Sequence, residues 1–247
     1  MRLREHLLVL ASFLIVPMVS ANDWLSWRGP ENNGISREKN LPDKLDQVLW
    51  KKGPKEGIGC RSTPLVMNGR VYIINNVGEG INEQERVMCM DAKTGKVLWE
   101  HRFPVFFTPI VSVRLGWTVI SGDPETEYVY AHGTQGLFFC FDKNGKVIWS
   151  RSLTEEYGRI SGYGGRVTSP VIEGDMVIIG MLNASLGKNW GGQTRFVAFD
   201  KKTGKVKWWA GTGIRPKNSY NCTPIVATIN GERVLLSGGG DGCVHAF

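Results

Sequence analysis

The chain has 247 residues, 42% of them apolar and 21% charged, which is enough core material for a large folded domain and excludes an intrinsically disordered chain. Its 31 glycines and 9 tryptophans indicate many short strands joined by tight turns. The formal net charge is +7, but lysines such as Lys143 and Lys201 recur at repeated turns instead of forming one stripe; we expect them to be solvated, and we expect no nucleic-acid partner.

Residues 1–21 have the layout of a secretory signal peptide. A positively charged start is followed by an apolar run over residues 7–16 and by the small-residue cleavage site Val19-Ser20-Ala21. A membrane-spanning helix needs about 20 apolar residues, more than this run supplies. The sequence therefore predicts export to the periplasm or cell envelope, with no transmembrane segment once the signal peptide is removed.

A short motif occurs three times, as DAKTGKVLWE at residues 91–100, DKNGKVIWS at 142–150 and DKKTGKVKWW at 200–209. The aspartate can accept hydrogen bonds from the turn that it begins, the glycine can take a positive φ, and the tryptophan can cover the seam with a neighbouring unit. These structural repeat residues are Asp91, Gly95, Trp99, Asp142, Gly145, Trp149, Asp200, Gly204 and Trp208. The motif therefore predicts architecture and not chemistry.

Three units have a second landmark upstream, a small residue followed by proline: Thr63-Pro64, Ser169-Pro170 and Thr223-Pro224. An apolar run follows, interrupted by an Asn-Gly or Glu-Gly turn, so each unit is expected to hold four strands. Four-stranded units repeated about every 50–55 residues, without helical periodicity between them, predict a β-propeller. A β-sandwich is the alternative, but a sandwich would not need the same turn motif at the same position in every unit.

The predicted organisation after the signal peptide is an N-terminal segment over residues 22–46, an outer strand at 47–52, blades at about 60–101, 110–151 and 165–210, and an incomplete blade at 220–247. The sequence ends where the fourth copy of the motif would begin. We therefore expect a partial ring, with about four blades of a larger propeller. In the alternative, the strand at 47–51 completes the last blade and closes a ring of four.

The pattern A-x-D-x-x-T-G-K-x-x-W resembles the tryptophan-docking motif of the pyrroloquinoline-quinone (PQQ) type of β-propeller repeat. It is matched in full by Ala198, Asp200, Thr203, Gly204, Lys205 and Trp208, and the other two copies carry Cys89 or Cys140 in place of the alanine. The N-terminal Trp27-Arg28-Gly29-Pro30 also resembles exported bacterial members of this superfamily. The resemblance implies a ring that commonly has eight blades, and small buried groups at Cys89 and Cys140.

Dehydrogenases of this superfamily hold PQQ over a tryptophan, with a calcium ion bound by carboxylate and amide oxygens, an aspartate as base and, in many members, a disulfide between adjacent cysteines. The five cysteines and four histidines of this sequence are dispersed, with no adjacent pair and no C-x-x-C, so we expect no metal site, and disulfide pairing stays open. The acidic group Asp123, Glu125 and Glu127 is expected to be a solvated hairpin turn. We therefore assign no catalytic residue and no cofactor.

The resemblance instead favours a non-catalytic binding or scaffolding module of the periplasm or cell envelope, with a protein or envelope partner. Two places are candidate contact sites: Arg61, Arg166 and Asn221 precede inner strands near the propeller axis, and Trp190 lies in an insertion at 183–194. Ordinary solvated loops are the alternative for both. The alternative function is the N-terminal part of a PQQ-dependent quinoprotein dehydrogenase of alcohols or sugars, which would use PQQ and Ca²⁺.

Overall fold

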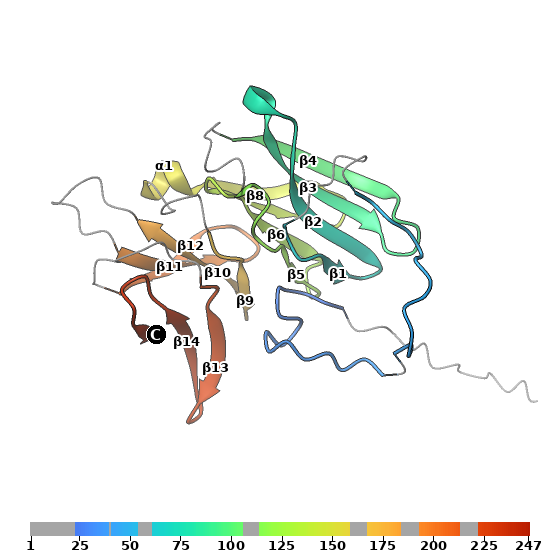
Figure 1. Cartoon of the computed structure of the whole chain (residues 1–247). Coiled ribbons are helices and arrows are strands. Elements are labelled where there is room, and N and C mark those ends of the chain that lie inside the picture. Colours follow the sequence, from blue (N-terminus) through green and yellow to red (C-terminus); the bar gives the residue numbers. More distant parts are fainter. Residues whose placement is uncertain are drawn as a thin grey trace, which may run out of the picture.

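The computed structural model describes residues 23–39, 41–53, 61–105, 114–158, 167–183, 193–212 and 222–247. These residues form four antiparallel sheets that follow one another along the chain (Figure 1). In each sheet the strands are ordered as in the sequence, so every sheet is a meander, and we call the sheets blades 1 to 4. The predicted signal peptide at 1–21 lies outside the described residues.

The described strands have three to eight residues each. Blade 1 consists of β1 (Leu65–Met67), β2 (Arg70–Val77), β3 (Gln84–Asp91) and β4 (Val97–Pro104). Blade 2 consists of β5 (Ser121–Asp123), β6 (Tyr128–His132), β7 (Leu137–Phe141) and β8 (Val147–Ser152). Blade 3 consists of β9 (Val171–Glu173), β10 (Met176–Asn183), β11 (Gln193–Asp200) and β12 (Val206–Gly211), and blade 4 of β13 (Ile225–Ile229), β14 (Glu232–Gly238) and β15 (Val244–Ala246). Two short helical elements are η2 (Gly80–Asn82) and α1 (Leu153–Tyr157).

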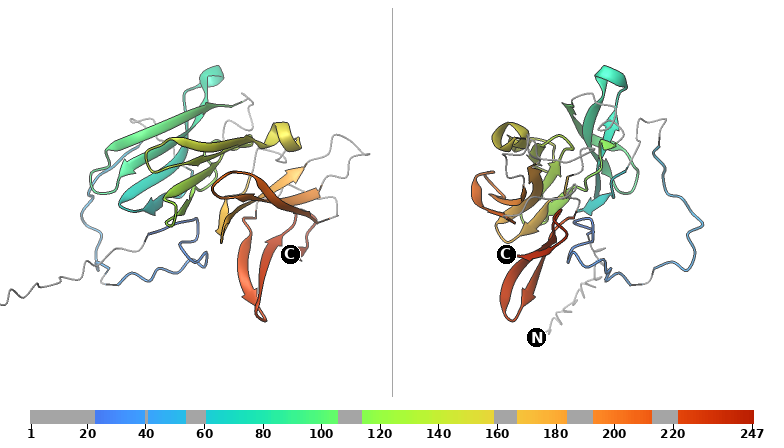
Figure 2. Two further views of the ribbon diagram at one scale, coloured as in Figure 1. Left: turned by 180° about the vertical axis from the view of Figure 1, so that it is seen from behind. Right: turned by 60° about the vertical axis from the view of Figure 1, so that its left-hand side comes forward.

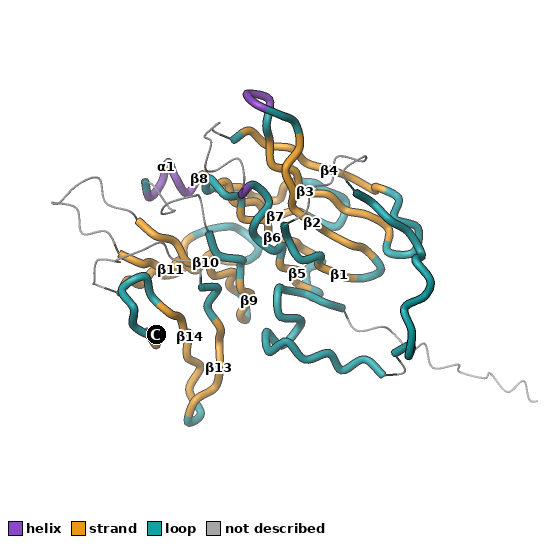
Figure 3. The backbone as a smooth tube through the Cα atoms, in the orientation of Figure 1, coloured by secondary structure: helices purple, strands orange, loops and turns teal. Residues whose placement is uncertain are grey.

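The predicted all-β architecture of antiparallel propeller blades is confirmed. Figure 3 shows that strands and turns make up most of the described chain. Figures 1 and 2 show the blades following one another as an open arc, from blade 1 in cyan and green to blade 4 in red. The fold is therefore a partial propeller in the part of the chain that the structure describes.

One predicted element is absent: residues 47–52 form no strand. A strand needs a neighbour with which to exchange ladder hydrogen bonds, and none of the described strands pairs with this segment. Trp50 nevertheless contacts blade 1 through its indole ring, whose Nε1 donates to the carbonyl oxygen of Ala92 at 2.9 Å. The segment is thus attached by one side chain instead of by a backbone ladder.

The aspartate of the repeated motif organises the turn between the third and fourth strands of its blade. Asp91 Oδ1 accepts hydrogen bonds from the Thr94 hydroxyl (2.7 Å) and from the N–H groups of Thr94 (2.8 Å) and Lys93 (3.1 Å). These bonds, led by those from Thr94, hold the pKa of Asp91 below its usual range. Gly95 completes the turn with a φ of +67°, a conformation that glycine adopts without strain.

The tryptophan of the motif lies directly across the ladder from a small residue. Trp99 pairs with Cys89 and Trp149 with Cys140, and a β-bulge follows at the same position in both blades. A larger side chain at the position of either cysteine would compete with the indole ring for space. Both cysteines are fully buried free thiols, and burial raises the pKa of Cys89 to about 11. Their role in this fold is packing.

Indole rings also join blade 1 to blade 2 and blade 2 to blade 3. The ring of Trp99 in blade 1 lies over Gly145 in the turn of blade 2, and its Nε1 donates to the carbonyl oxygen of Lys143 at 2.9 Å. Trp149 repeats both contacts on blade 3, and Trp50 repeats them on blade 1. The same motif therefore supplies the tryptophan ring of one blade and, in the following blade, the glycine against which that ring packs.

A methyl group at Gly145 is expected to destabilise this seam. Its Cβ would lie 2.7 Å from the Trp99 ring, and the backbone φ is +86°. Gly231 has a φ of +87° but no atom within 4 Å of an added Cβ, so Gly231→Ala is a matched control that carries only the backbone cost. That cost is about 1 kcal/mol, and we expect Gly145→Ala to lose about 1–3 kcal/mol more in urea denaturation because the indole must move. Equal losses in the two variants would contradict this account of the glycine.

Apolar side chains fill the seams between blades. Phe141 of β7 faces blade 1, where its ring centroid lies 5.5 Å from that of Trp99. Phe138 of the same strand faces blade 3, with its centroid 5.7 Å from that of Phe199. Alternate residues of β7 thus fill two different seams, which explains why this strand is continuously apolar in the sequence.

Candidate functional site

The first strands of neighbouring blades touch, β1 with β5 and β5 with β9, and so mark the inner edge of the arc. Hydroxyl residues before the proline steps connect the blades there. The hydroxyl oxygen of Ser169 accepts the N–H of Val119 from blade 2 at 3.0 Å, and the N–H of Ser169 donates to Thr223 Oγ1 of blade 4 at 3.3 Å. The repeated Ser/Thr-Pro step is therefore a connector between successive blades.

The N-terminal segment, residues 23–39, lies along this inner edge. The N–H and carbonyl of Trp24 bond to Val66 in β1 at 2.9 and 3.0 Å, and the carbonyl of Leu25 accepts the N–H of Gly122 in β5 at 2.9 Å. Figure 1 shows the segment in blue beside β1 and β5. The segment therefore covers the first strands of blades 1 and 2.

A cavity of about 480 Å³ lies between the N-terminal segment and blade 4. The segment contributes Trp27, Arg28 and Asn32, and blade 4 contributes apolar residues such as Ile225 and Leu236. The volume is within the range of pockets that hold a small molecule or a partner's side chain. Apolar walls with one guanidinium group suit a ligand that is partly apolar and partly anionic.

Only one of the four predicted contact residues can be placed. Arg61 is exposed, shortly before β1, and it does not line the cavity. Arg166, Trp190 and Asn221 lie outside the described residues. The cavity residue Arg28 was not predicted, because nothing local in Trp-Arg-Gly-Pro reveals which blade the segment approaches.

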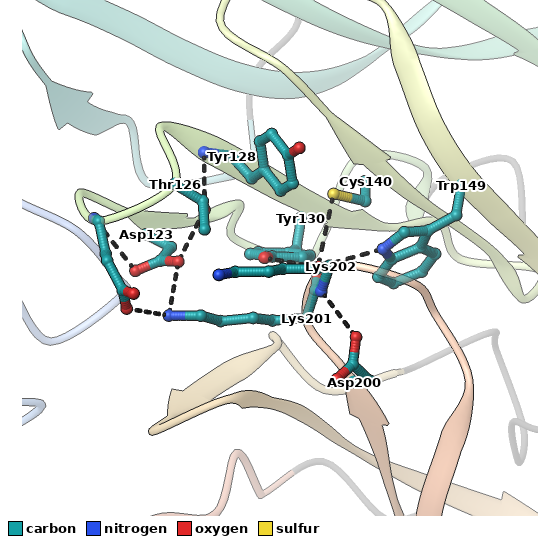
Figure 4. Close-up of polar contacts among 10 residues, drawn as sticks. Asp123, Thr126, Tyr128, Tyr130, Cys140, Trp149, Asp200, Lys201 and Lys202 are labelled. Atoms are coloured by element: carbon teal, nitrogen blue, oxygen red, sulfur yellow. Dashed lines mark hydrogen bonds and ion pairs between the residues drawn. The ribbon is translucent and has the colours of Figure 1, made fainter.

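The seam between blades 2 and 3 contains a buried ion pair. Lys201, which follows the motif aspartate of blade 3, is 3% exposed, and its Nζ lies 2.9 Å from Asp123 Oδ2 and 2.6 Å from Glu125 Oε2 (Figure 4). Asp123 is 4% exposed and also accepts the Thr126 hydroxyl at 2.7 Å. The predictions of a solvated Asp123 and a solvated Lys201 are thus wrong, because the turns that carry them meet across the seam.

The backbone of Lys201 also contributes to the contact between blades 2 and 3. Its carbonyl oxygen accepts the indole N–H of Trp149 at 3.1 Å and the hydroxyl of Tyr130 at 3.0 Å, both from blade 2 (Figure 4). Burial raises the pKa of Asp123, but hydrogen bonds from Lys201 and Thr126 outweigh burial and hold that pKa below its usual range. Burial lowers the pKa of Lys201, but the carboxylates beside it outweigh that effect and raise the pKa. Both groups are charged and paired, which suits a structural joint and leaves neither as a free acid or base.

A buried carboxyl group connects blades 1 and 2. Glu85 in β3 is fully buried; its Oε1 accepts the N–H of Gly116 at 2.8 Å and the hydroxyl of Thr134 at 2.6 Å, and its Oε2 accepts the N–H of Thr134 at 2.9 Å. Burial raises the pKa of Glu85 against the opposing effect of these hydrogen bonds. Both carboxyl oxygens are therefore already engaged within the protein.

Glu85 should make the stability of the protein depend on pH. Because its pKa is higher in the folded chain than the 4.5 of an unperturbed glutamate, its contribution is present below about pH 4.5 and is lost as the pH rises through the folded-state pKa. Between about pH 4.5 and the folded-state pKa, the free energy of unfolding should therefore decline less steeply in Glu85→Gln than in the wild-type protein. Urea denaturation at a series of pH values measures this decline. Glu79→Gln, at an exposed position, is the control. An unchanged slope in Glu85→Gln would contradict this assignment.

Blade 4 brings together three side chains of the kinds that bind metals. Asp241, Cys243 and His245 place one ligand atom each within 4.8 Å of the others. The sequence analysis predicts no metal site, because the cysteines and histidines carry no familiar metal-binding spacing such as C-x-x-C. The signal that would have found the cluster is the alternation D-x-C-x-H, since alternate residues of a strand share one face.

Two buried carboxylates, Glu85 and Asp123, do not fit the role of ligands for the calcium ion that the resemblance implies for the dehydrogenases. Both are already engaged, Glu85 by Thr134 and Gly116 and Asp123 by Lys201. The N-terminal segment, in addition, covers β1 and β5 at the inner edge. These groups are therefore not available as calcium ligands in the part of the chain that the structure describes.

Comparison with known proteins identifies the family to which the chain belongs. Residues 83–246 match a family model described as outer membrane protein assembly factor BamB. The dehydrogenase subunit of alcohol dehydrogenase (quinone) from Komagataeibacter europaeus is 30% identical over 186 residues, which cover 72% of this chain and 23% of that protein. The corresponding subunit from Gluconobacter oxydans strain 621H is 28% identical over 211 residues, covering 79% and 25% of the two chains. The chain thus spans about a quarter of the length of these curated relatives.

A solved structure shares the fold. The quinohemoprotein alcohol dehydrogenase from Comamonas testosteroni superposes with a TM-score of 0.53 at 20% identity, covering 76% of this chain and 27% of that one. At this level of identity the similarity concerns the arrangement of the blades. None of the described helices is long and apolar enough to cross a membrane.

Proposed function

The chain belongs to the PQQ-repeat family described as outer membrane protein assembly factor BamB, and from this premise we propose that it is a non-catalytic binding module of the periplasm or cell envelope. The blades form the support for binding in this proposal, because the seams between blades 1 and 2 and between blades 2 and 3 are each tied by an indole ring and by buried polar groups. The partner is a protein or an envelope component. The N-terminal segment and the adjoining cavity are the proposed contact surface.

The observation that carries this proposal is the position of the N-terminal segment. Its backbone is tied to β1 and β5, and its exposed Trp27 lines, together with Arg28, the cavity in front of blade 4. Tryptophan and arginine are the residue types that most often carry the binding energy of a protein interface. A partner segment with an apolar side chain for the cavity and a carboxylate for Arg28 fits this surface.

Site-specific photocrosslinking tests the proposal. A photoreactive amino acid replaces Trp27 in the full chain expressed in its own host, and the same substitution at Trp209, an exposed tryptophan of β12, serves as the matched control. We expect a discrete adduct from position 27, weakened by Arg28→Glu in the same chain, and none from position 209. Equal labelling from both positions, or an adduct that Arg28→Glu leaves unchanged, would contradict the proposed surface.

A quinoprotein dehydrogenase is the second candidate, favoured by the relatives, which are subunits of alcohol dehydrogenase (quinone). The test adds PQQ and Ca²⁺ to the product of the complete gene and measures dye-linked oxidation of alcohols and sugars. Quenching of protein fluorescence by PQQ supplies a readout that does not require turnover. We expect neither signal; saturable quenching together with PQQ-dependent oxidation would replace the binding module with the enzyme.

A further inference from the structure

The hairpin at the end of blade 4 holds an aspartate in a fixed position. The turn between β14 and β15 is closed by Gly239, whose N–H donates to the carbonyl oxygen of Cys243 at 2.7 Å, and by Gly242, whose N–H donates to that of Gly239 at 3.1 Å. Asp241 folds back over this turn, and its Oδ1 accepts the N–H of Cys243 at 3.1 Å. That bond fixes the orientation of the carboxylate. Its second oxygen is left to face the strand.

The second oxygen meets a histidine. Asp241 Oδ2 lies 2.9 Å from His245 Nε2, and the side chain of Asp241 is 4% exposed while that of Cys243 is exposed. Cys243 and His245 stand two residues apart, so they share one face of the β14–β15 hairpin. The oxygen, sulfur and nitrogen ligand atoms lie within 4.8 Å of one another.

We propose that Asp241, Cys243 and His245 bind a divalent transition-metal ion of the zinc class. Bonds of about 2.0–2.3 Å in a tetrahedral zinc site set neighbouring ligand atoms about 3.3–3.7 Å apart. The carboxylate and imidazole need to separate by only a few tenths of an ångström, and the exposed thiol reaches the site by rotating. A thiolate with an imidazole is a ligand set for zinc-like ions, whereas calcium and magnesium take oxygen ligands.

The site leaves one coordination position open. Three protein ligands on one hairpin supply three corners of a tetrahedron, and the exposed side of Cys243 leaves the fourth to water or to a partner's ligand atom. Gly239 provides the room: a Cβ there would lie 2.9 Å from His245 Nε2 and would also collide with Asp241 Oδ1. Gly238, its neighbour, would meet only the sulfur of Cys222, at 3.9 Å.

Metal titration of the full chain, freed of metal with a chelator and kept reduced, tests the proposal. Isothermal calorimetry with Zn²⁺ should give one ion per chain. Co²⁺ should give the visible absorption of a tetrahedral site and a thiolate-to-cobalt band in the near ultraviolet. Cys243→Ser should abolish the thiolate band, and His245→Ala should weaken Zn²⁺ binding by at least about tenfold.

Two matched controls separate the site from the rest of blade 4. Cys222→Ser removes an exposed thiol of the same blade and should change neither signal. Gly239→Ala should weaken binding, whereas Gly238→Ala should not; if Gly239→Ala fails to fold, the exposed Cys243→Ser still carries the test. Absence of stoichiometric Zn²⁺ binding by a chain with the circular dichroism of a folded β-protein would overturn the proposal. So would binding that survives both Cys243→Ser and His245→Ala.

Discussion

Trp149→Ala is expected to lower the free energy of unfolding by about 3–5 kcal/mol, the range for truncating a buried tryptophan. Trp149 is 8% exposed, and its ring centroid lies 5.9 Å from that of Tyr130 and 5.2 Å from that of Phe138. Its indole also donates to the carbonyl oxygen of Lys201 in the next blade. The truncation therefore leaves a cavity in the seam and removes a donor from a buried carbonyl group. Urea denaturation followed by circular dichroism measures the loss.

Trp209→Ala is the matched control for this prediction. Trp209 lies in β12 and is 64% exposed, and its ring contacts the guanidinium of Arg195, whose Cζ is 5.6 Å from the ring centroid. An exposed contact of this kind contributes less than about 1 kcal/mol. If the two variants lost equal stability, the seam contacts of Trp149 would not be what holds blades 2 and 3 together.

Lys201→Met should cause the second largest loss of stability, because it leaves the buried carboxylate of Asp123 without its cationic partner. The pair borders solvent through the exposed carboxylate of Glu125, so the expected loss is about 2–3 kcal/mol, between the values for exposed and fully buried pairs. Lys202→Met, at the exposed neighbouring position, is the control and should change stability by less than about 0.5 kcal/mol. Urea denaturation at neutral pH measures both variants.

A double-mutant cycle with Asp123→Asn identifies the interaction. Removing both charges should cost less than the sum of the single changes, since neither charge is then left unpaired. The pKa of Asp123 is lower in the folded chain than the 3.8 of an unperturbed aspartate, so the pair contributes above about pH 3.8 and is lost as the pH falls through the folded-state pKa. The difference between the wild-type protein and Lys201→Met should therefore shrink only in acid. Strict additivity in the cycle would show that the two side chains do not interact.

Local chemistry made the blades predictable. Asp91, Thr94 and Gly95 form their turn through contacts within five residues, so the repeated motif already contains what the turn needs. The apolar runs likewise mark the strands, because an inner strand such as β7 presents its two faces to two neighbouring blades. The all-β fold and its meander order could therefore be predicted from the repeat.

Contacts between blades were not predictable in the same way. Lys201 and Asp123 look like solvated turn residues in isolation, and only the approach of two blades buries them together. Residues 47–52 have the composition of a strand, but strand formation depends on a neighbour that the segment itself does not provide. The candidate surface at Trp27 and Arg28 depends in turn on where the N-terminal segment is laid.

By itself, the sequence determined the repeat, the turn chemistry and the small residue that faces each tryptophan, because these depend on neighbours along the chain or along one ladder. Only the tertiary structure decided which charges are buried and where the N-terminal segment lies. The physical reason is that burial is set by surfaces from different blades, and a linear pattern does not encode which surfaces meet.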